Sequence, residues 1–353
     1  MLTSDEINRY SAQLKLDQIG LNGQRHLKNA RVLCVGAGGL GSPLLLYLAA
    51  AGVGTIGIID ADSVELSNLQ RQILYQHRQV GQQKTLVAKK QLKKLNPYIK
   101  IITYNQRINQ QNAKAIITEY DILADCTDNF PSKYLLHDHC FYLNKPYVFA
   151  SVSQYAGQCS VFLGQQGPCL RCLFPKQPSL MQDCSQTGVL GVLPGLFGII
   201  QATEVIKLIL KLGNLLVSRL LMIDILAMKF REYQITQNPD CECCVKNNFH
   251  RIKEMPHHTI SAQELQQRLT DQQDIFLLDV RSPEEHQHYN FGGTLIPLSE
   301  LPHRLAELNP NQTIVVYCHS GVRSLHAVQL LLRAQFKSVM NLEGGVVAWR
   351  ALS

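Results

Sequence analysis

The chain has 353 residues, of which 46% are hydrophobic and 17% charged, so it can bury a sizeable core and does not belong to the disordered class. Its first residues, MLTSDEINRY, lack the basic and apolar regions of a signal peptide. No uncharged apolar run reaches about 18 residues, the length of a membrane span. We therefore expect a cytoplasmic protein without a membrane segment.

The net charge of +7 is unevenly distributed. From His257 onward there are 7 Lys and Arg against 9 Asp and Glu, which leaves 27 against 18 before it. A basic amino-terminal part suits nucleotide phosphates or an acidic protein partner. No aromatic-rich basic stripe accompanies it, so specific nucleic-acid binding is not expected.

The amino-terminal part alternates apolar strands with helical patterns. Strands are expected over residues 31–35, 55–60, 100–104, 121–125, 147–151, 157–163 and 219–224, and helices over 44–51, 84–95, 113–119 and 196–211. Such alternation is typical of an α/β fold with a Rossmann-like, doubly wound parallel sheet.

Residues 238–258 are polar, rich in cysteine and without periodicity, so we place the domain boundary there. We predict a first domain over residues 1–247, a linker over 248–257 and a smaller α/β domain over 258–353. In the smaller domain, helices are expected over 261–269 and 324–335, and strands over 275–279 and 313–317.

A glycine-rich turn follows the first strand and opens a helix. Its glycines are Gly36, Gly38, Gly39 and Gly41. The backbone amides of such a turn and the helix dipole can hold a phosphate. Asp60 ends the next strand, where a carboxylate can bind ribose hydroxyls, as in dinucleotide-binding folds. An NAD-dependent oxidoreductase is therefore one interpretation.

The residues after Asp60 favour a different chemistry. Asn68, Arg71 and Lys84 follow it, and hydride transfer has no need of such groups. Charge that develops on a leaving pyrophosphate does need them, because it must be met by fixed donors and Mg²⁺. Asp128, within the run DCTDN, is a hard ligand suited to that magnesium ion.

The runs GAGGLG, IIDADSVELSNLQRQ, VGQQK and DCTDN together resemble the ubiquitin-activating-enzyme-like family of MoeB/ThiF-type adenylyltransferases, over roughly residues 3–245. The resemblance implies ATP as substrate and a homodimer. It assigns the glycine turn and Asp60 to nucleotide binding. It assigns the phosphates to Asn68, Arg71 and Lys84 and Mg²⁺ to Asp128, and it adds Asn129 to the nucleotide-binding residues.

One departure from the family is found near the amino terminus. The family usually reads RYxRQ there, and its second arginine is thought to reach the ATP of the neighbouring subunit. This chain reads RYSAQ, with Ala12 in that place. Either Arg9 or another cation takes the place of that arginine, or adenylation is slower, since losing one positive charge that stabilises a transferring phosphate costs roughly several kcal/mol.

The 11 cysteines point to metal binding and catalysis rather than disulfides, because several stand in CxxC pairs. Two such pairs can close a tetrahedral site around one structural Zn²⁺, with Cys243 as a spare thiol. The four zinc ligands are Cys169, Cys172, Cys241 and Cys244. Four further cysteines in apolar segments are predicted core residues: Cys34, Cys126, Cys140 and Cys159.

Cys184 stands in a polar loop, KQPSLMQDCSQTG, where a thiol can reach a bound protein terminus. It matches the family's active-site cysteine, which attacks the activated carboxylate or resolves a disulfide on it. An incidental loop cysteine is the alternative.

In the second domain, VVYCHSGVRS runs from a strand through a short loop into a helix, with Cys318 first and Arg323 five positions later. Successive backbone amides, the helix dipole and the arginine would favour a thiolate over the ordinary thiol. Together with LDVRSPEE and LEGGVVAW, this loop resembles a rhodanese domain, over about residues 258–353. The resemblance implies a sulfur carrier, and a docking-only rhodanese fold is the alternative.

The fused order resembles the MoeB–rhodanese type, including MoeZ- and MoeBR-like proteins. It implies ATP-dependent adenylation of the Gly-Gly terminus of a ubiquitin-like sulfur carrier, followed by sulfur transfer from a persulfide on Cys318. A MoaD-like carrier for molybdopterin is preferred, while carriers for thiamine, cysteine or tRNA thiolation stay open. The sulfur donor is a cysteine desulfurase or thiosulfate. A non-catalytic docking scaffold, weakened by Ala12, is a further alternative.

Overall fold

The computed structural model describes residues 2–175, 188–246 and 259–352. The chain divides between residues 252 and 253 into two compact units.

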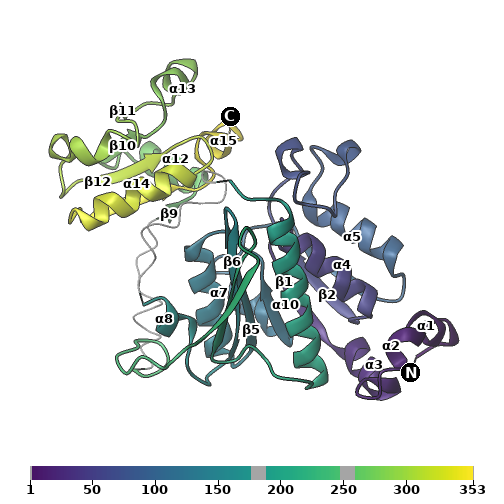
Figure 1. Ribbon diagram of the computed structural model, residues 1–353. Coiled ribbons are helices and arrows are strands. Elements are labelled where there is room, and N and C mark those ends of the chain that lie inside the picture. Colours follow the sequence, from purple (N-terminus) through teal and green to yellow (C-terminus); the bar gives the residue numbers. More distant parts are fainter. Residues whose placement is uncertain (1, 176–187, 247–258, 353) are drawn as a thin grey trace. The chain divides into compact units, whose positions relative to one another are not determined.

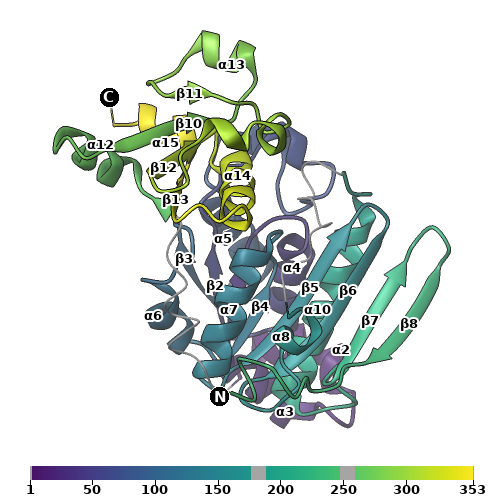
Figure 2. The same ribbon diagram turned by 90° about the vertical axis from the view of Figure 1, so that its left-hand side faces the viewer.

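The first unit is built on one eight-stranded sheet with the order β3-β2-β1-β4-β5-β6-β7-β8. Neighbouring strands from β3 to β5 are parallel, and those from β5 to β8 are antiparallel. The strands are β1 (Arg31–Val35), β2 (Thr55–Ile59), β3 (Lys100–Tyr104), β4 (Ile122–Asp125), β5 (Pro146–Ser153), β6 (Ala156–Leu163), β7 (Arg219–Asp224) and β8 (Lys229–Gln234). Figure 2 shows β7 and β8 as a hairpin at one end of the sheet.

Helices cover both faces of this sheet (Figures 1 and 2). They are α1 (Ser4–Arg9), α2 (Ser11–Leu14), α3 (Gly20–Asn29), α4 (Gly41–Ala51), α5 (Lys84–Leu95), α6 (Ala113–Thr118), α7 (Phe130–Tyr142), α8 (Leu170–Leu173) and α10 (Val192–Leu210), with short 3-10 turns η1 (Leu66–Asn68) and η2 (His77–Gln79). Alternate residues of β1 enter separate cores. Val32 and Cys34 pack with residues of α4, α5 and α10, whereas Leu33 and Val35 pack with residues of α6 and α7. The fold is therefore doubly wound, as predicted.

Among the described residues, one helix, α10, is long and apolar enough to span a membrane. It packs against α4, β5 and β6, and Phe197 and Val205 are fully buried there. The apolar character of the helix is therefore explained by its place over the sheet.

The second unit has a parallel sheet of five strands in the order β11-β10-β12-β13-β9. Its strands are β9 (Thr259–Ile260), β10 (Ile275–Asp279), β11 (Thr294–Leu295), β12 (Thr313–Tyr317) and β13 (Ser338–Leu342). Its helices are α12 (Ala262–Thr270), α13 (Pro283–His288), α14 (Val322–Arg333) and α15 (Gly345–Arg350), with 3-10 turns η3 (Leu301–His303) and η4 (Leu305–Glu307). Two core clusters, one on each side of the sheet, again separate alternate residues of β12.

Candidate functional site

The glycine turn follows β1, beside β2 and β4, where the order of the parallel strands reverses. Open α/β sheets bind ligands at such a point. Gly36 has φ +93°, and a Cβ there would lie 2.6 Å from the carbonyl oxygen of Cys126. A Cβ on Gly41 would lie 2.1 Å from the carbonyl oxygen of Gly36. Both positions therefore require glycine, and the turn keeps its backbone exposed to a ligand near Gly38, where a Cβ would meet nothing closer than 3.6 Å.

Asp60 fixes the turn from the end of β2. Its carboxylate accepts hydrogen bonds from the backbone amides of Ala37 and Asp62, both at 2.8 Å. Burial raises the pKa of Asp60, and the positive charge of Lys84 opposes that effect. The hydroxyl of Tyr75 donates to the Ala37 carbonyl at 2.7 Å. The carboxylate that the sequence assigns to the ribose thus lies beside the glycine turn.

The predicted phosphate-binding side chains follow β2 and converge on the same region. Lys84 is buried at the start of α5, and its ammonium group lies 3.1 Å from Asp62. Arg71 donates to the Ser67 carbonyl at 3.1 Å, and its Cγ lies 3.5 Å from the position of a Cβ on Gly39. Asn68 is buried in η1. The structure thus brings Arg71 against the glycine turn and Lys84 against the acidic residues that follow β2.

Asp128 is exposed after β4, at the same edge of the sheet. Its carboxylate accepts a hydrogen bond from the Asn129 side chain at 3.3 Å. The side-chain oxygen of Asn129, Oδ1, also accepts a hydrogen bond from the Ser132 backbone amide at 2.9 Å and so caps α7. Asn129 therefore has a structural role besides the ligand role assigned to it.

A buried ion pair that was not predicted from the sequence lies beneath this edge. The ammonium group of Lys133 lies 3.2 Å from Asp125 and donates to the carbonyls of Thr127 and Ala150 at 2.8 Å. Tyr147 also donates to Asp125. This network fixes the turn between β4 and Asp128. A lysine within a largely apolar helix was the signal that could have revealed it.

Arg9, the proposed substitute for the family's second arginine, is engaged within its own chain. Its guanidinium group donates to the Leu95 carbonyl at the end of α5. Ala12 is exposed on α2.

The four predicted zinc ligands come together. The sulfur atoms of Cys169 and Cys172 are 3.8 Å apart, those of Cys169 and Cys241 are 3.5 Å apart, and those of Cys172 and Cys244 are 3.4 Å apart. A tetrahedral zinc ion with Zn–S bonds of about 2.3 Å requires separations of about 3.8 Å. The donor set therefore fits Zn²⁺. Cys243, the spare thiol, is fully buried beside Cys169.

A chain of polar contacts supports the first CxxC pair. The Leu170 amide donates to His137 Nε2 at 3.1 Å, and His137 Nδ1 lies 3.0 Å from Asp138. Arg171 closes the chain with two hydrogen bonds to Asp138 at 2.9 and 2.6 Å. The short helix α8 is thereby held against α7.

The remaining cysteines of the first domain fall into two groups. The four predicted core cysteines are buried: they are Cys34, Cys126, Cys140 and Cys159. Cys184 lies outside the described residues, so its predicted role stays a prediction.

Cys318 follows β12 in the second unit and is buried. Its sulfur accepts hydrogen bonds from the Gly321 amide and the Ser324 hydroxyl, both at 3.2 Å. The Val346 amide donates to the Cys318 carbonyl at 2.8 Å, and a Cβ on Gly345 would lie 2.2 Å from that oxygen. The run LEGG thus packs a second turn against the cysteine loop.

Arg323 lies in the first turn of α14 and is paired with Glu285 of α13. The two terminal guanidinium nitrogens donate to the carboxylate oxygens, each at 2.6 Å. Two guanidinium nitrogens of Arg281 donate to the carboxylate of Asp279, which is buried, and His286 Nδ1 lies 2.8 Å from the same carboxylate. Arg323, the arginine of the predicted sulfur site, is therefore held in place by the carboxylate of Glu285, a contact that was not predicted from the sequence.

The profile of the ThiF family matches residues 10–244, and that of the rhodanese-like domain matches residues 261–352. "Probable adenylyltransferase/sulfurtransferase MoeZ" of Mycobacterium tuberculosis is 38% identical over 367 residues, which cover 99% of this chain and 94% of the relative. "Sulfur carrier protein adenylyltransferase" of Thermus thermophilus is 45% identical over 249 residues, 69% of this chain and 92% of the relative. Among solved structures, E. coli MccB with ATP aligns with a TM-score of 0.60 and 28% identity, over 67% of this chain and 74% of the other.

Proposed function

The chain belongs to the ThiF family and carries a rhodanese-like domain, and we propose that it adenylates a small sulfur-carrier protein and then transfers sulfur to it. The α/β fold and the class of enzyme, adenylyltransferase with sulfurtransferase, were both predicted and are confirmed by these matches. The observation that carries the proposal is the presence in one chain of two sites. One is a glycine turn flanked by Asp60, Arg71 and Lys84, and the other is a loop that holds the sulfur of Cys318.

In the adenylation step, a carboxylate oxygen of the carrier's Gly-Gly terminus attacks the α-phosphorus of ATP. The bond from that phosphorus to the bridging oxygen breaks, and pyrophosphate leaves with the electron pair. Asp60 would bind the ribose, while Asn68, Arg71 and Lys84 would meet the charge of the leaving group. Mg²⁺, held by Asp128, would offset phosphate charge when bound.

In the transfer step, the terminal sulfur of a persulfide on Cys318 attacks the activated carbonyl carbon, and AMP leaves. The product is an acyl disulfide between the carrier and Cys318. The thiolate of Cys184 then attacks the Cys318 sulfur, and the thiocarboxylate leaves with the electron pair. A thiol reductant supplies two electrons to clear the resulting Cys184–Cys318 disulfide.

The four-cysteine cluster would hold Zn²⁺ as a structural ion. It ties α8, which follows β6, to residues 241–244, which follow β8. The zinc ion would thus cross-link two distant parts of the first domain. No step of the reaction involves it.

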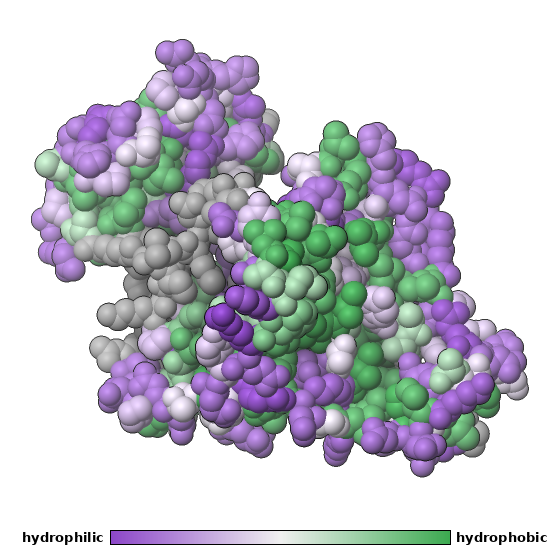
Figure 3. Space-filling view, viewed as in Figure 1, coloured by the Kyte–Doolittle hydropathy of each residue, from purple (hydrophilic) through white to green (hydrophobic). Residues whose placement is uncertain are grey.

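We also propose that the protein is a homodimer. Three large apolar side chains are exposed on two helices of the first unit: Tyr47 (54%) on α4, and Val192 (68%) and Ile199 (38%) on α10. Figure 3 shows a continuous hydrophobic area in the region of α10. Apolar areas of this kind mark protein interfaces.

A MoaD-like carrier remains the preferred partner, with a cysteine desulfurase or thiosulfate as sulfur donor, in the cytoplasm. The test uses the purified chain with ATP, Mg²⁺, a Gly-Gly carrier and a sulfur donor. The Cys318→Ala variant should lose thiocarboxylate formation but keep carrier-dependent adenylation. Unchanged sulfur transfer in this variant would exclude Cys318 as the sulfur-bearing group. Nicotinamide binding without carrier-dependent pyrophosphate release would favour the oxidoreductase instead.

A further inference from the structure

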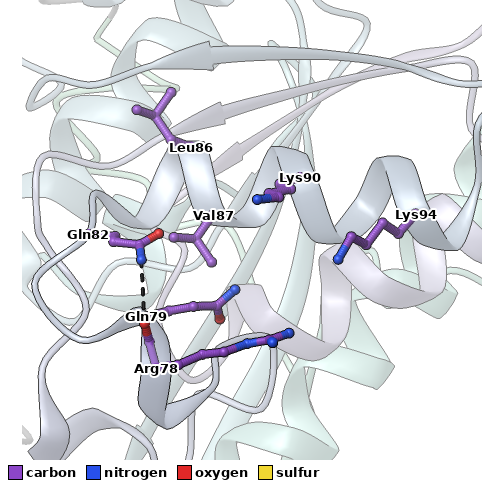
Figure 4. Close-up of a pocket in the computed structure, with 7 residues that line it drawn as sticks. All are labelled: Arg78, Gln79, Gln82, Leu86, Val87, Lys90 and Lys94. Atoms are coloured by element: carbon purple, nitrogen blue, oxygen red, sulfur yellow. Dashed lines mark hydrogen bonds between the residues drawn. The ribbon is translucent and has the colours of Figure 1, made fainter.

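A hollow of about 410 Å³ lies on the first unit between η2 and α5 (Figure 4). Three cations line it: Arg78 from η2, and Lys90 and Lys94 from α5. Gln79 and Gln82 add two side-chain amides, and Leu86 adds an apolar contact. The described lining contains no acidic residue. Its volume is within the range of small-molecule sites, about 300–1,000 Å³.

The fold places these cations together. Leu86, Lys90 and Lys94 recur every four residues and so share one face of α5. Arg78 extends alongside that face from η2, as Figure 4 shows. Its Nε donates to the Gln76 side chain at 3.0 Å, and its carbonyl accepts from the Gln82 side chain at 3.4 Å. These contacts stabilise the turn of residues 76–82 that leads into α5.

The three cations have no carboxylate partner among the described residues. None of them takes part in the ion pairs found in residues 2–175, 188–246 and 259–352. Like charges gathered in a concave site repel one another and raise the local concentration of anions. A bound multivalent anion would remove that repulsion.

The lysines that line the hollow lie farther along α5 than the lysine assigned to the nucleotide site. Lys84, assigned to the ATP phosphates, begins α5 and is turned toward Asp62. Lys90 lies six residues later, about 9 Å along the helix axis at 1.5 Å per residue. A ligand bound by Lys90 and Lys94 would therefore lie away from Lys84.

We propose that this hollow binds a small condensed phosphate of the pyrophosphate class. Several phosphoryl oxygens can engage ammonium, guanidinium and amide donors at once, which a single carboxylate cannot do. Nucleic acid fits less well, because the described lining offers no aromatic side chain on which a base could stack. The proposal goes beyond the adenylation reaction and does not depend on it.

Calorimetric titration of the full chain with inorganic pyrophosphate, without Mg²⁺ and at low salt, tests the proposal. The pocket variant carries Arg78→Gln, Lys90→Gln and Lys94→Gln. The matched control carries Lys89→Gln, Lys100→Gln and Lys229→Gln, which remove the same charge from exposed positions outside the hollow. A third variant, Arg71→Ala with Lys84→Ala, weakens the nucleotide site. Circular dichroism verifies that each variant is folded.

We expect the nucleotide-site variant to keep one pyrophosphate site, and the pocket changes added to it to weaken that site by about tenfold or more. The control changes, added in the same way, should alter affinity by less than about twofold. Equal losses in pocket and control variants would overturn the proposal, because the binding would then reflect diffuse charge. Affinity unchanged by the pocket changes would overturn it too. So would binding of a Glu-rich peptide at the hollow in the absence of pyrophosphate binding.

Discussion

The carboxylate of Glu285 binds both terminal nitrogens of Arg323 at 2.6 Å, so a residue of α13 holds the arginine that follows the cysteine loop. These hydrogen bonds lower the pKa of Glu285 from 4.5 to about 2. A carboxyl group whose pKa is lower in the folded state stabilises the fold above its unfolded pKa, and the contribution is lost as pH falls. The pair should therefore stabilise the protein fully above pH 4.5 and progressively less toward pH 2.

This prediction is checked with Glu285→Gln. Urea unfolding at pH values from 7 down to 3 gives the difference in unfolding free energy between the parent protein and the variant. We expect that difference to be constant near neutrality and to shrink below pH 4.5. A difference that does not vary with pH would mean that the carboxylate charge contributes nothing.

Lys133→Met should destabilise the first unit, because it leaves the buried carboxylate of Asp125 without its cation. Breaking a buried pair from one side costs about 3–5 kcal/mol. Urea unfolding measures the loss, and Lys89→Met, at an exposed position, should change stability by less than about 0.5 kcal/mol. Adding Asp125→Asn to Lys133→Met should recover part of the loss. If the losses of unfolding free energy caused by the two substitutions were fully additive, the ion pair would be contradicted.

Cys172→Ser should abolish stoichiometric zinc, because it removes one of four ligands. Metal analysis of the purified protein should give about one zinc per chain for the parent and much less for the variant, with a lower Tm. Cys159→Ala, a buried thiol elsewhere in the sheet, is the matched control and should keep its zinc. Cys243→Ala should also keep zinc. Loss of zinc from the Cys243→Ala variant would show that Cys243 is a zinc ligand rather than the spare thiol.

Val192→Glu should weaken the proposed dimer, because it places a charge at an exposed apolar position on α10. Light scattering after size exclusion should give twice the chain mass of 39.7 kDa for the parent protein and a concentration-dependent decrease for the variant. Leu226→Glu, at an equally exposed residue of the β7–β8 turn, should leave the mass unchanged. A monomeric parent protein would exclude the dimer.

Strands with a continuous apolar run were predictable from the sequence, whether they are buried on both faces, as β1 and β12 are, or only partly buried, as β3, β7 and β10 are. β1, β3, β7, β10 and β12 begin and end at the predicted residues. β8 was not predicted. All six of its residues are exposed, and it exists through antiparallel pairing with β7, which no local pattern reveals. α7 was missed as well, because it is buried on several sides and lacks a single apolar face.

The chemistry of the candidate site was predictable in kind but not in its contacts. The glycines, Asp60 and the cations that follow it could be assigned to a nucleotide site, because the carboxyl ends of parallel strands meet at one edge of a sheet. The cap made by Asn129 and the pair between Arg323 and Glu285 could not. Each depends on a rotamer or on a contact between helices, and residue types alone do not determine these.

The most direct measurement is ATP–pyrophosphate exchange with the full chain in the presence of MoaD-like and ThiS-like carriers that end in Gly-Gly. We expect exchange that requires a carrier and is lost in Asp128→Ala, and the carrier that supports exchange would identify the pathway. Bound ATP without exchange for any carrier would contradict adenylation. It would then identify Ala12 as a functional lesion and leave a docking scaffold or a sulfurtransferase without adenylation.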